Sequence, residues 1–201
     1  MPSRSDIDRI DSRILEDLKI KVVVTAREMF ESELIKSTFG VVSVRIPQTG
    51  CVLITPSGFT KSRVATENLC VVDLNGNLIR GNMRPSSETS MHVYVHKRVT
   101  AANAVLHTHS PAASAFAIAK RDIPCVSTEQ GFAFGDNIPV VREYFCPGTK
   151  DPRKLESVVD ALKKAKVVLL KSHGVLATGV DLEEALDNAV VVEDIAKSVL
   201  Y

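Results

Sequence analysis

Apolar residues recur at helical spacing in the first part of the chain. Ile7, Ile10, Ile14 and Leu18 are each three or four positions apart, and charged residues fill many of the positions between them. This spacing places the apolar side chains on one face of a helix. It predicts one or two helices over residues 5–37, with acidic and basic residues on the outer faces.

Four later helices are predicted from their start signals. Serine or aspartate followed by proline or an acidic residue is typical of a helix N-terminus, and Asp-Leu-Glu-Glu at 181–184 has the form of a capping box. These signals predict helices over residues 85–97, 110–119, 151–165 and 181–200.

Short runs rich in β-branched residues, separated by proline, glycine and asparagine, predict strands between these helices. The Asn-Gly-Asn sequence at 75–77 is typical of a hairpin turn. The stretch from 121 to 150 is less regular, and we assign no helix or strand to it. The predicted strands span residues 40–46, 51–55, 69–74, 78–79, 103–107, 166–171 and 175–178.

This mixture of strands and helices predicts the α/β class, with a central sheet covered by helices. The sequence contains no internal repeat, linker or low-complexity tract. A chain of 201 residues can bury a sizeable core. We therefore expect a single domain over residues 1–201.

The charge balance argues against two classes of partner. The chain has 25 basic and 24 acidic residues and a formal net charge of +1. Such a balance offers no general attraction for nucleic acid or for an anionic membrane, so any anionic ligand has to be bound locally. The four cysteines are widely spaced, and we expect them to be small hydrophobic residues in a reducing compartment.

Two further features favour a soluble protein of the cytoplasm. The first ten residues lack the apolar segment of a signal peptide. No uninterrupted apolar run is long enough to span a bilayer. We expect a cytoplasmic location and no membrane partner.

Three histidines predict a metal site. His107 and His109 lie two positions apart at the end of an apolar run, and strand geometry points both imidazoles to one face. His173 follows a second apolar run. A single histidine at such a place is more often an ordinary core residue, but three in matching settings favour a metal. Three imidazoles with one open position are typical of catalytic zinc.

His92 and His96 offer a competing metal site, because histidines four positions apart on a helix can also bind zinc. Val93 occupies the position that holds glutamate in the His-Glu-x-x-His motif of metalloproteases. A metalloprotease is therefore disfavoured. We expect His92 to be partly buried near Glu88 and His96 to lie on the surface.

An acidic residue and several serines suggest acid/base chemistry and anion binding. Glu88 follows Ser86 and Ser87 at a predicted helix N-terminus, where free N–H groups favour an anion. Ser57 and Gly58 follow a strand and could contact a phosphate without any lysine. Taken alone, Ser-Ser-Glu is more simply a helix cap and Thr-Pro-Ser-Gly a turn. The functional interpretation gains weight because the chain also offers a three-histidine metal site.

Five motifs together resemble the class II aldolase/adducin family, in the family's order and from about residue 10 to 200. Each motif is moderately specific, and the combination is highly specific. The motifs are Gly-Val-Val-Ser-Val-Arg at 40–45, Ile-Thr-Pro-Ser-Gly at 54–58, Pro-Ser-Ser-Glu-Thr-Ser-Met-His at 85–92, Ala-Val-Leu-His-Thr-His at 104–109 and Leu-Lys-Ser-His-Gly at 170–174.

The resemblance implies a fold, an assembly and a reaction. The fold is a central, mostly antiparallel sheet between helical layers, and the assembly is usually a homotetramer with active sites at subunit interfaces. The reaction is zinc-dependent cleavage of a ketose 1-phosphate of the L-fuculose 1-phosphate type. Its products are dihydroxyacetone phosphate and an aldehyde such as L-lactaldehyde, and it proceeds through a metal-stabilised enediolate.

The resemblance also implies roles for individual residues. Zinc, or another divalent metal, is held by the three histidines named above. Glu88 is the catalytic acid/base and a possible fourth ligand in the resting site. The residues implied to bind the sugar phosphate are Gly40, Ser57, Gly58, Ser86 and Ser87.

Three departures from the family pattern affect aldehyde specificity and the proton donor to the leaving oxygen. Val41 stands where many relatives have asparagine, and Thr128 stands where aldolases of this substrate place a catalytic tyrosine. The sequence stops at Tyr201, before the tail that supplies a second tyrosine in those enzymes. Glu129 and Tyr144 are the candidate substitutes.

Three other functions stay open on the same scaffold. An L-ribulose-5-phosphate 4-epimerase breaks and remakes a similar bond with the same metal, but such relatives usually carry aspartate at the position of Glu88. A sugar-phosphate dehydratase is a second alternative. A non-enzymatic, adducin-like scaffold is a third, and the presence of all three histidines argues against it.

Overall fold

The computed structural model describes residues 11–143, 146 and 148–200. In this part of the chain, eight strands form one sheet in the order β4-β3-β2-β1-β5-β8-β7-β6. Neighbouring strands are antiparallel except β6 and β7, which are parallel. The strands are β1 (Val41–Arg45), β2 (Cys51–Ile54), β3 (Cys70–Asp73), β4 (Leu78–Arg80), β5 (Ala104–Thr108), β6 (Val140–Val141), β7 (Val167–Leu170) and β8 (Gly174–Gly179).

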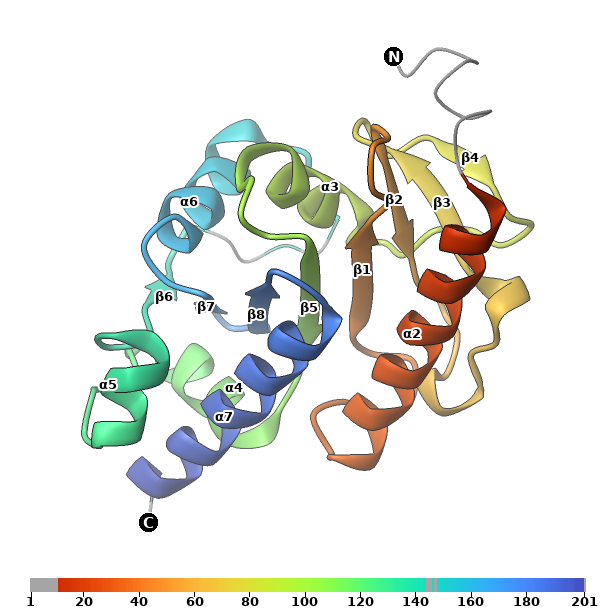
Figure 1. Cartoon of the computed structure of the whole chain (residues 1–201). Coiled ribbons are helices and arrows are strands. Elements are labelled where there is room, and N and C mark those ends of the chain that lie inside the picture. The colour runs from red at the N-terminus through yellow and green to blue at the C-terminus, as the bar shows by residue number, and fades with distance from the viewer. Residues whose placement is uncertain (1–10, 144–145, 147, 201) are drawn as a thin grey trace.

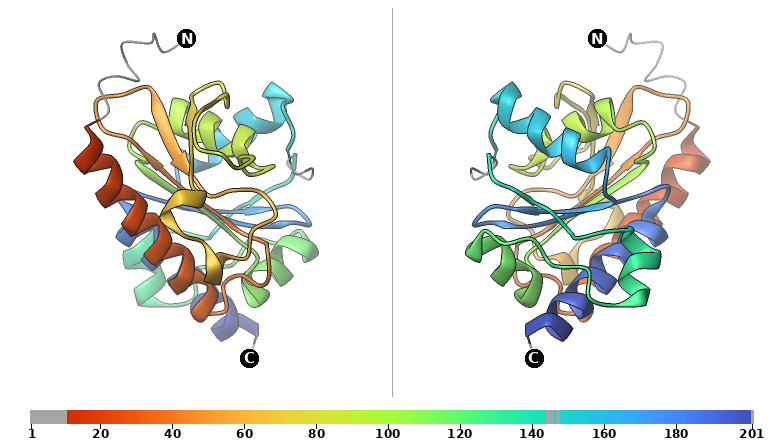
Figure 2. Two further views of the ribbon diagram at one scale, coloured as in Figure 1. Left: turned by 90° about the vertical axis from the view of Figure 1, so that its right-hand side faces the viewer. Right: turned by 90° about the vertical axis from the view of Figure 1, so that its left-hand side faces the viewer.

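Helices cover both faces of this sheet (Figure 1). The α-helices are α2 (Ser12–Glu31), α3 (Thr89–Arg98), α4 (Pro111–Ala119), α5 (Thr128–Phe134), α6 (Pro152–Leu162) and α7 (Leu182–Leu200), and the short 3-10 turns are η1 (Lys61–Arg63) and η2 (Thr66–Asn68). Figure 2 shows the sheet nearly edge-on between two helical layers. The predicted fold class, a mostly antiparallel sheet flanked by helices, is confirmed.

The apolar core is divided by the sheet. One cluster joins α2, α4 and α7 to one face, and a second joins α3 and α6 to the other. Strands β2, β5, β7 and β8 are buried along their whole length, so both their faces are covered. This arrangement explains why these strands appear in the sequence as continuous apolar runs and not as strict alternation.

Most predicted elements are confirmed, with three differences. One helix, α2, occupies the described part of 5–37, and residues 5–10 lie outside the described residues. Helix α3 begins at Thr89 and not near residue 85, because a β-bridge between Pro56 and Pro85 keeps the preceding segment extended. The irregular stretch contains α5 and β6, which are too short to show a pattern.

The structure also bears on the cysteines and on membrane-spanning segments. Cys51 and Cys70 are buried, as expected for small hydrophobic residues, whereas Cys125 and Cys146 are exposed, so the expectation was wrong for them. Among the helices of the described residues, none has both the length and the apolar character that crossing a membrane requires.

Candidate metal centre and its cavity

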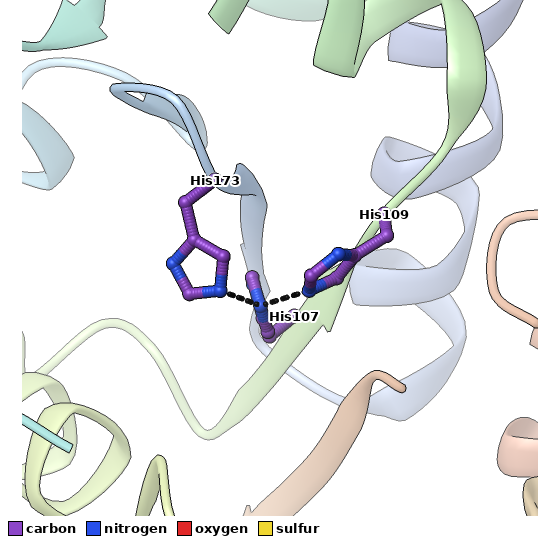
Figure 3. A group of neighbouring side chains, drawn as sticks. All are labelled: His107, His109 and His173. Atoms are coloured by element: carbon purple, nitrogen blue, oxygen red, sulfur yellow. Dashed lines mark hydrogen bonds between the residues drawn. The ribbon is translucent and has the colours of Figure 1, made fainter. Parts of the chain in front are cut away.

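Three neighbouring segments of the sheet bring the predicted metal ligands together. His107 lies in β5, His109 lies just beyond its end, and His173 lies in the turn between β7 and β8. Because β5 pairs with β8, this turn lies beside the end of β5. Figure 3 shows the three rings facing one another. We call these residues the three-histidine cluster, and one nitrogen of each ring lies within 4.8 Å of the other two.

The hydrogen bonds of His107 determine which ring nitrogen is available. Its Nδ1 atom lies 2.8 Å from the carbonyl oxygen of Val175. A carbonyl can only accept a hydrogen bond, so Nδ1 carries the proton and Nε2 keeps its lone pair. Such a bond from the far side of the ring is typical of metal-binding histidines, whose orientation it holds.

The nitrogen positions suit a shared cation. Nε2 of His107 lies 2.9 Å from Nε2 of His109 and 3.2 Å from Nε2 of His173 (Figure 3). One lone pair cannot accept good hydrogen bonds from both neighbours, whereas a cation among the three nitrogens can use a lone pair from each. The residues therefore fit a divalent metal ion.

The electrostatics of the cluster favour neutral rings. Burial lowers the pKa of His107 well below the usual 6.5, and the nearby His173 and His109 lower it further. Burial, followed by the proximity of His109, lowers the pKa of His173 to about 4. Burial also lowers the pKa of His109. At neutral pH all three imidazoles are uncharged, which is the form that binds a metal.

Two glycines allow the backbone to approach the cluster closely. A Cβ atom on Gly174 would lie 2.3 Å from the carbonyl oxygen of Thr108, so no other residue fits there without movement of the backbone. Gly40 has a φ of +82°, and a Cβ atom there would lie 2.5 Å from the side chain of Ile35. Gly40 is thus required by packing and by conformation. These constraints hold β1, β5 and β8 close together around His107.

Glu88 lies at the edge of the cluster. It precedes α3 as its N-cap residue, and its side chain is nearly buried, with the whole residue 5% exposed. Its Oε1 atom is 3.8 Å from Nε2 of His173. This position places a carboxylate beside the candidate metal ligands, within the same cavity.

The cavity has a volume of about 250 Å³, which is small even for a ligand pocket. The β-bridge between Pro56 and Pro85 aligns the two serine-containing loops on one side of it. Every site residue predicted from the sequence lines this cavity, namely Gly40, Ser57, Gly58, Ser86, Ser87, Glu88, His107, His109 and His173. The structure thus brings all of them together, and their individual roles stay predictions.

The two serines before α3 differ in their surroundings. Ser86 is buried, and its hydroxyl oxygen accepts a hydrogen bond of 3.2 Å from the N–H of Glu88. The carbonyl oxygen of Ser86 also accepts hydrogen bonds from Thr89. Ser87 is exposed. Ser86 therefore supports the start of α3, and its own hydroxyl proton is still available to a ligand.

Sequence reasoning missed a charged residue of the cavity, Lys61. It begins η1 and is only 1% exposed. Its ammonium donates hydrogen bonds to the carbonyl oxygens of Thr38 (3.1 Å) and Phe59 (3.0 Å). Burial lowers the pKa of Lys61 to about 8. The available signal was a lysine three positions after Gly58, in a turn that the sequence already suggested as a phosphate contact.

The competing histidines, His92 and His96, form a separate group that we call the buried pair. Both are 0% exposed, so the expectation of a surface position for His96 was wrong, and His92 is fully and not partly buried. The Ser43 hydroxyl lies 2.7 Å from Nδ1 of His92 and 2.9 Å from Nε2 of His96. Burial lowers the pKa of each histidine to about 3. Helix α3 turns both rings toward β1, away from the cavity.

The candidate substitutes for the family's tyrosine do not enter this cavity. Glu129 and Thr128 lie on α5, are exposed, and are not among the residues that line the cavity. Tyr144 lies outside the described residues. Val41 does line the cavity, where β1 pairs it with His107. Its apolar side chain stands where the family resemblance implies an amide.

Comparisons with known proteins agree with the motifs. The family described as Class II Aldolase and Adducin N-terminal domain matches residues 20–200 of the chain. A solved L-fuculose 1-phosphate aldolase is similar at 29% identity and a TM-score of 0.85, over 92% of this chain and 85% of its own. The L-fuculose-1-phosphate aldolase of Thermus thermophilus is similar at 30% identity and a TM-score of 0.78, over 92% and 93%.

A third solved structure leaves the reaction type more open. The YgbL protein of Klebsiella pneumoniae, for which aldolase, epimerase and decarboxylase activities are all considered, is similar at 27% identity. Its TM-score is 0.82, over 92% of this chain and 89% of its own. Together these matches confirm the family resemblance.

Proposed function

Because this chain belongs to the class II aldolase and adducin family, we propose that it is a metal-dependent aldolase of sugar phosphates. The proposed reaction is the reversible cleavage of a ketose 1-phosphate of the L-fuculose 1-phosphate type. Its products are dihydroxyacetone phosphate and an aldehyde such as L-lactaldehyde. The observation that carries the proposal is one small cavity that joins three imidazoles, a carboxylate and several hydroxyl groups.

The three-histidine cluster would hold the metal, for which we propose zinc. When bound, the ion would act as a Lewis acid that stabilises negative charge on the substrate's oxygens. Neutral imidazoles add no negative charge to the site, so they leave the ion's full positive charge available. Val175 contributes by accepting the Nδ1 proton of His107 and thereby holding that ring in place.

Glu88 would move the proton at carbon 3. In the cleavage direction a base of the completed site takes the proton of the hydroxyl at carbon 4. The bond between carbons 3 and 4 then breaks, carbon 4 becomes the aldehyde, and the electron pair of the bond stays on carbon 3. The fragment left behind is an enediolate, and a protonated Glu88 delivers the proton that converts it to dihydroxyacetone phosphate. In the reverse direction the carboxylate removes that proton.

Hydroxyl groups and backbone N–H groups would bind the phosphate. Ser57, Ser86 and Ser87 supply hydroxyls on one side of the cavity, and Gly58 adds a backbone with no side chain in the way. The start of α3 lies beside these serines, where the helix dipole favours an anion. We include Gly40 in the proposed site through its backbone atoms, because packing against Ile35 leaves no room for a side chain there.

The surroundings of the site complete the proposal. We propose a single domain over residues 1–201, located in the cytoplasm, and a homotetramer in which a neighbouring subunit completes each active site. The absence of a tyrosine from the described lining of the cavity supports the last point, since the hydroxyl at carbon 4 needs a group that takes its proton during cleavage and returns it in the reverse direction. Light scattering of the purified protein tests the assembly.

The runner-up functions are an L-ribulose-5-phosphate 4-epimerase and a sugar-phosphate dehydratase. Glu88 favours the aldolase over the epimerase, because the resemblance associates aspartate at this position with epimerases. A non-enzymatic scaffold is disfavoured, because a scaffold has no need for three converging imidazoles.

A direct assay separates these functions. Zinc-loaded protein is incubated with L-fuculose 1-phosphate and, separately, with L-ribulose 5-phosphate. An aldolase releases dihydroxyacetone phosphate from the first substrate, which a coupled reductase detects. Inversion at carbon 4 of the second substrate without release indicates the epimerase, and loss of water from either substrate indicates a dehydratase. If metal analysis finds no stoichiometric metal ion in the purified protein, the scaffold is indicated.

A further inference from the structure

Lys61 is a buried cation in the wall of the candidate active site. It begins η1, the turn that follows Ser57 and Gly58, and it lines the same cavity as these residues. The residue is 1% exposed. Neither the motifs nor the family resemblance assigns it a role, and the phosphate contacts considered above use hydroxyls and backbone groups only.

Hydrogen bonds compensate only part of the cost of burying the ammonium of Lys61. It donates to the carbonyl oxygens of Thr38 and Phe59, which uses two of its three N–H groups. Within the described residues, no carboxylate forms an ion pair with it, and burial is the only cause that moves its pKa. A buried charge without a counter-charge is unfavourable, and proteins retain such groups mainly at functional sites.

A phosphate group would supply what this ammonium lacks. Serine hydroxyls donate hydrogen bonds to a phosphate but do not neutralise its charge, whereas a buried ammonium does both. The positions of Thr38 and Phe59 restrict the ammonium to the side of the cavity where the loops at 38–40 and 57–59 meet. This side also carries Ser57.

We propose that Lys61 provides the counter-charge for the phosphate of the substrate and makes the site selective for phosphorylated ketoses. The inference rests on the proposed function, because it assumes a phosphate-bearing substrate in this cavity. It adds a charged binding residue to a site that was otherwise built from neutral donors. Lys61 is a binding residue here and takes no part in proton transfer.

The test measures binding of inorganic phosphate by calorimetry to the metal-loaded protein, so that it does not depend on turnover. Lys61→Met removes the charge and both hydrogen bonds. Lys61→Gln keeps an amide that can donate to the carbonyls of Thr38 and Phe59 but removes the charge. Arg63→Gln removes an exposed positive charge from the same turn and is the matched control. The three histidines are intact in every variant, so any contribution of the metal is common to all.

The expected result is phosphate binding by the wild type and by the Arg63 variant, with binding about 10- to 100-fold weaker in both Lys61 variants, as for a lost charged hydrogen bond. Equal binding by Lys61→Gln and the wild type would overturn the proposal, because Lys61 would then only hold two loops together. A wild-type protein that binds no phosphate would overturn it as well.

A second measurement separates this inference from the proposed function. The KM for the phosphorylated ketose should rise in the Lys61 variants by a larger factor than the KM for the same ketose without phosphate. If the wild type binds phosphate through Lys61 but releases no dihydroxyacetone phosphate, the aldolase proposal fails and the phosphate site stands. If aldolase activity is present and both KM values rise equally, the phosphate role of Lys61 fails.

Discussion

The three-histidine cluster and the buried pair have similar sequence signals but different surroundings. Both groups contain histidines at short spacing, two or four positions apart, and burial lowers the pKa values in both. In the cluster, ring nitrogens face one another at the wall of a cavity. In the pair, ring nitrogens face the hydroxyl of Ser43 in the core.

The comparison shows that neither spacing nor a low pKa identifies a metal site. The available lone pairs distinguish the two groups. A serine hydroxyl has one proton, so it donates to one ring of the buried pair and accepts from the other. Ser43 thereby gives each ring of the pair one hydrogen bond inside the protein, while Nε2 of His92 and Nδ1 of His96 are buried without a partner among the described residues. In the cluster the lone pair of His107 points toward two other imidazoles, and only an added cation satisfies all three.

The largest expected effect is loss of the metal. Replacing His107, His109 or His173 by alanine should abolish both stoichiometric zinc and activity, because no neighbouring group can take the place of a direct metal ligand. Loss of a residue that only hydrogen-bonds to a ligand typically weakens metal binding by about 10- to 100-fold. Metal content is measured by mass spectrometry of the dialysed protein. His96→Gln is the control and should retain the metal. Full zinc in any alanine variant would remove that histidine from the site.

Glu88→Gln should give the next largest effect. The variant keeps the shape of the side chain but cannot exchange a proton, so turnover should fall about 10²- to 10⁴-fold while zinc stays bound. It should also stop the exchange of the carbon 3 proton of dihydroxyacetone phosphate with deuterium from solvent, which NMR detects without any aldehyde. Exchange at the wild-type rate would show that another group moves the proton.

The serines should have a smaller and selective effect. Replacing Ser86 and Ser87 together by alanine should weaken the binding of phosphorylated substrate by about 1.5–3 kcal/mol for each lost hydrogen bond. An unphosphorylated ketose should be barely affected. KM values for the two substrates provide the measurement. Equal losses for both would mean that these serines only support the start of α3.

Acid should destabilise the fold through the buried pair. The pKa of His92 and of His96 is about 3 in the folded protein, against 6.5 as the reference value. The unfolded chain therefore binds more protons between these values, and each histidine should lower the free energy of unfolding by about 1.4 kcal/mol per pH unit below 6.5. Above pH 6.5 the pair contributes no pH dependence.

Urea titrations of the metal-free protein at several pH values between 5 and 8 measure this dependence. His96→Gln removes one titrating group from the pair, so the decline toward acid should be less steep than in the wild type. The three-histidine cluster also titrates, but it is common to both proteins. A variant that declines as steeply as the wild type would contradict the burial of a neutral His96.

The smallest expected effect concerns Ser43. Ser43→Ala leaves two buried imidazoles without their shared hydroxyl and should reduce the free energy of unfolding by about 1–3 kcal/mol, with zinc content unchanged. Ser114→Ala is the matched control, because the Ser114 hydroxyl is buried and has no hydrogen-bond partner among the described residues. It should be close to neutral. Equal losses in the two variants, measured by urea unfolding, would argue against a special role for Ser43.

The sequence by itself determined most of the elements and pointed to the three histidines that form the candidate metal site. Continuous apolar runs predicted the buried strands, and proline, serine and aspartate located most helix starts, because these are effects of neighbouring residues on one another. The motif around His107 and His109 also consists of residues that are close together in the sequence. The short helix α5 was missed, since seven residues are too few to show helical periodicity.

Only the tertiary structure decided which side chains meet. The burial of His96 depends on Ser43, and these residues are 53 positions apart in the chain. Lys61 is buried because carbonyl groups of two separate loops accept its protons. A pattern of neighbouring residues contains no record of such contacts, because packing between distant segments determines where a ring nitrogen or an ammonium points. For this reason the candidate metal ligands were predictable from local motifs, whereas the buried Lys61 beside them was found only in the folded chain.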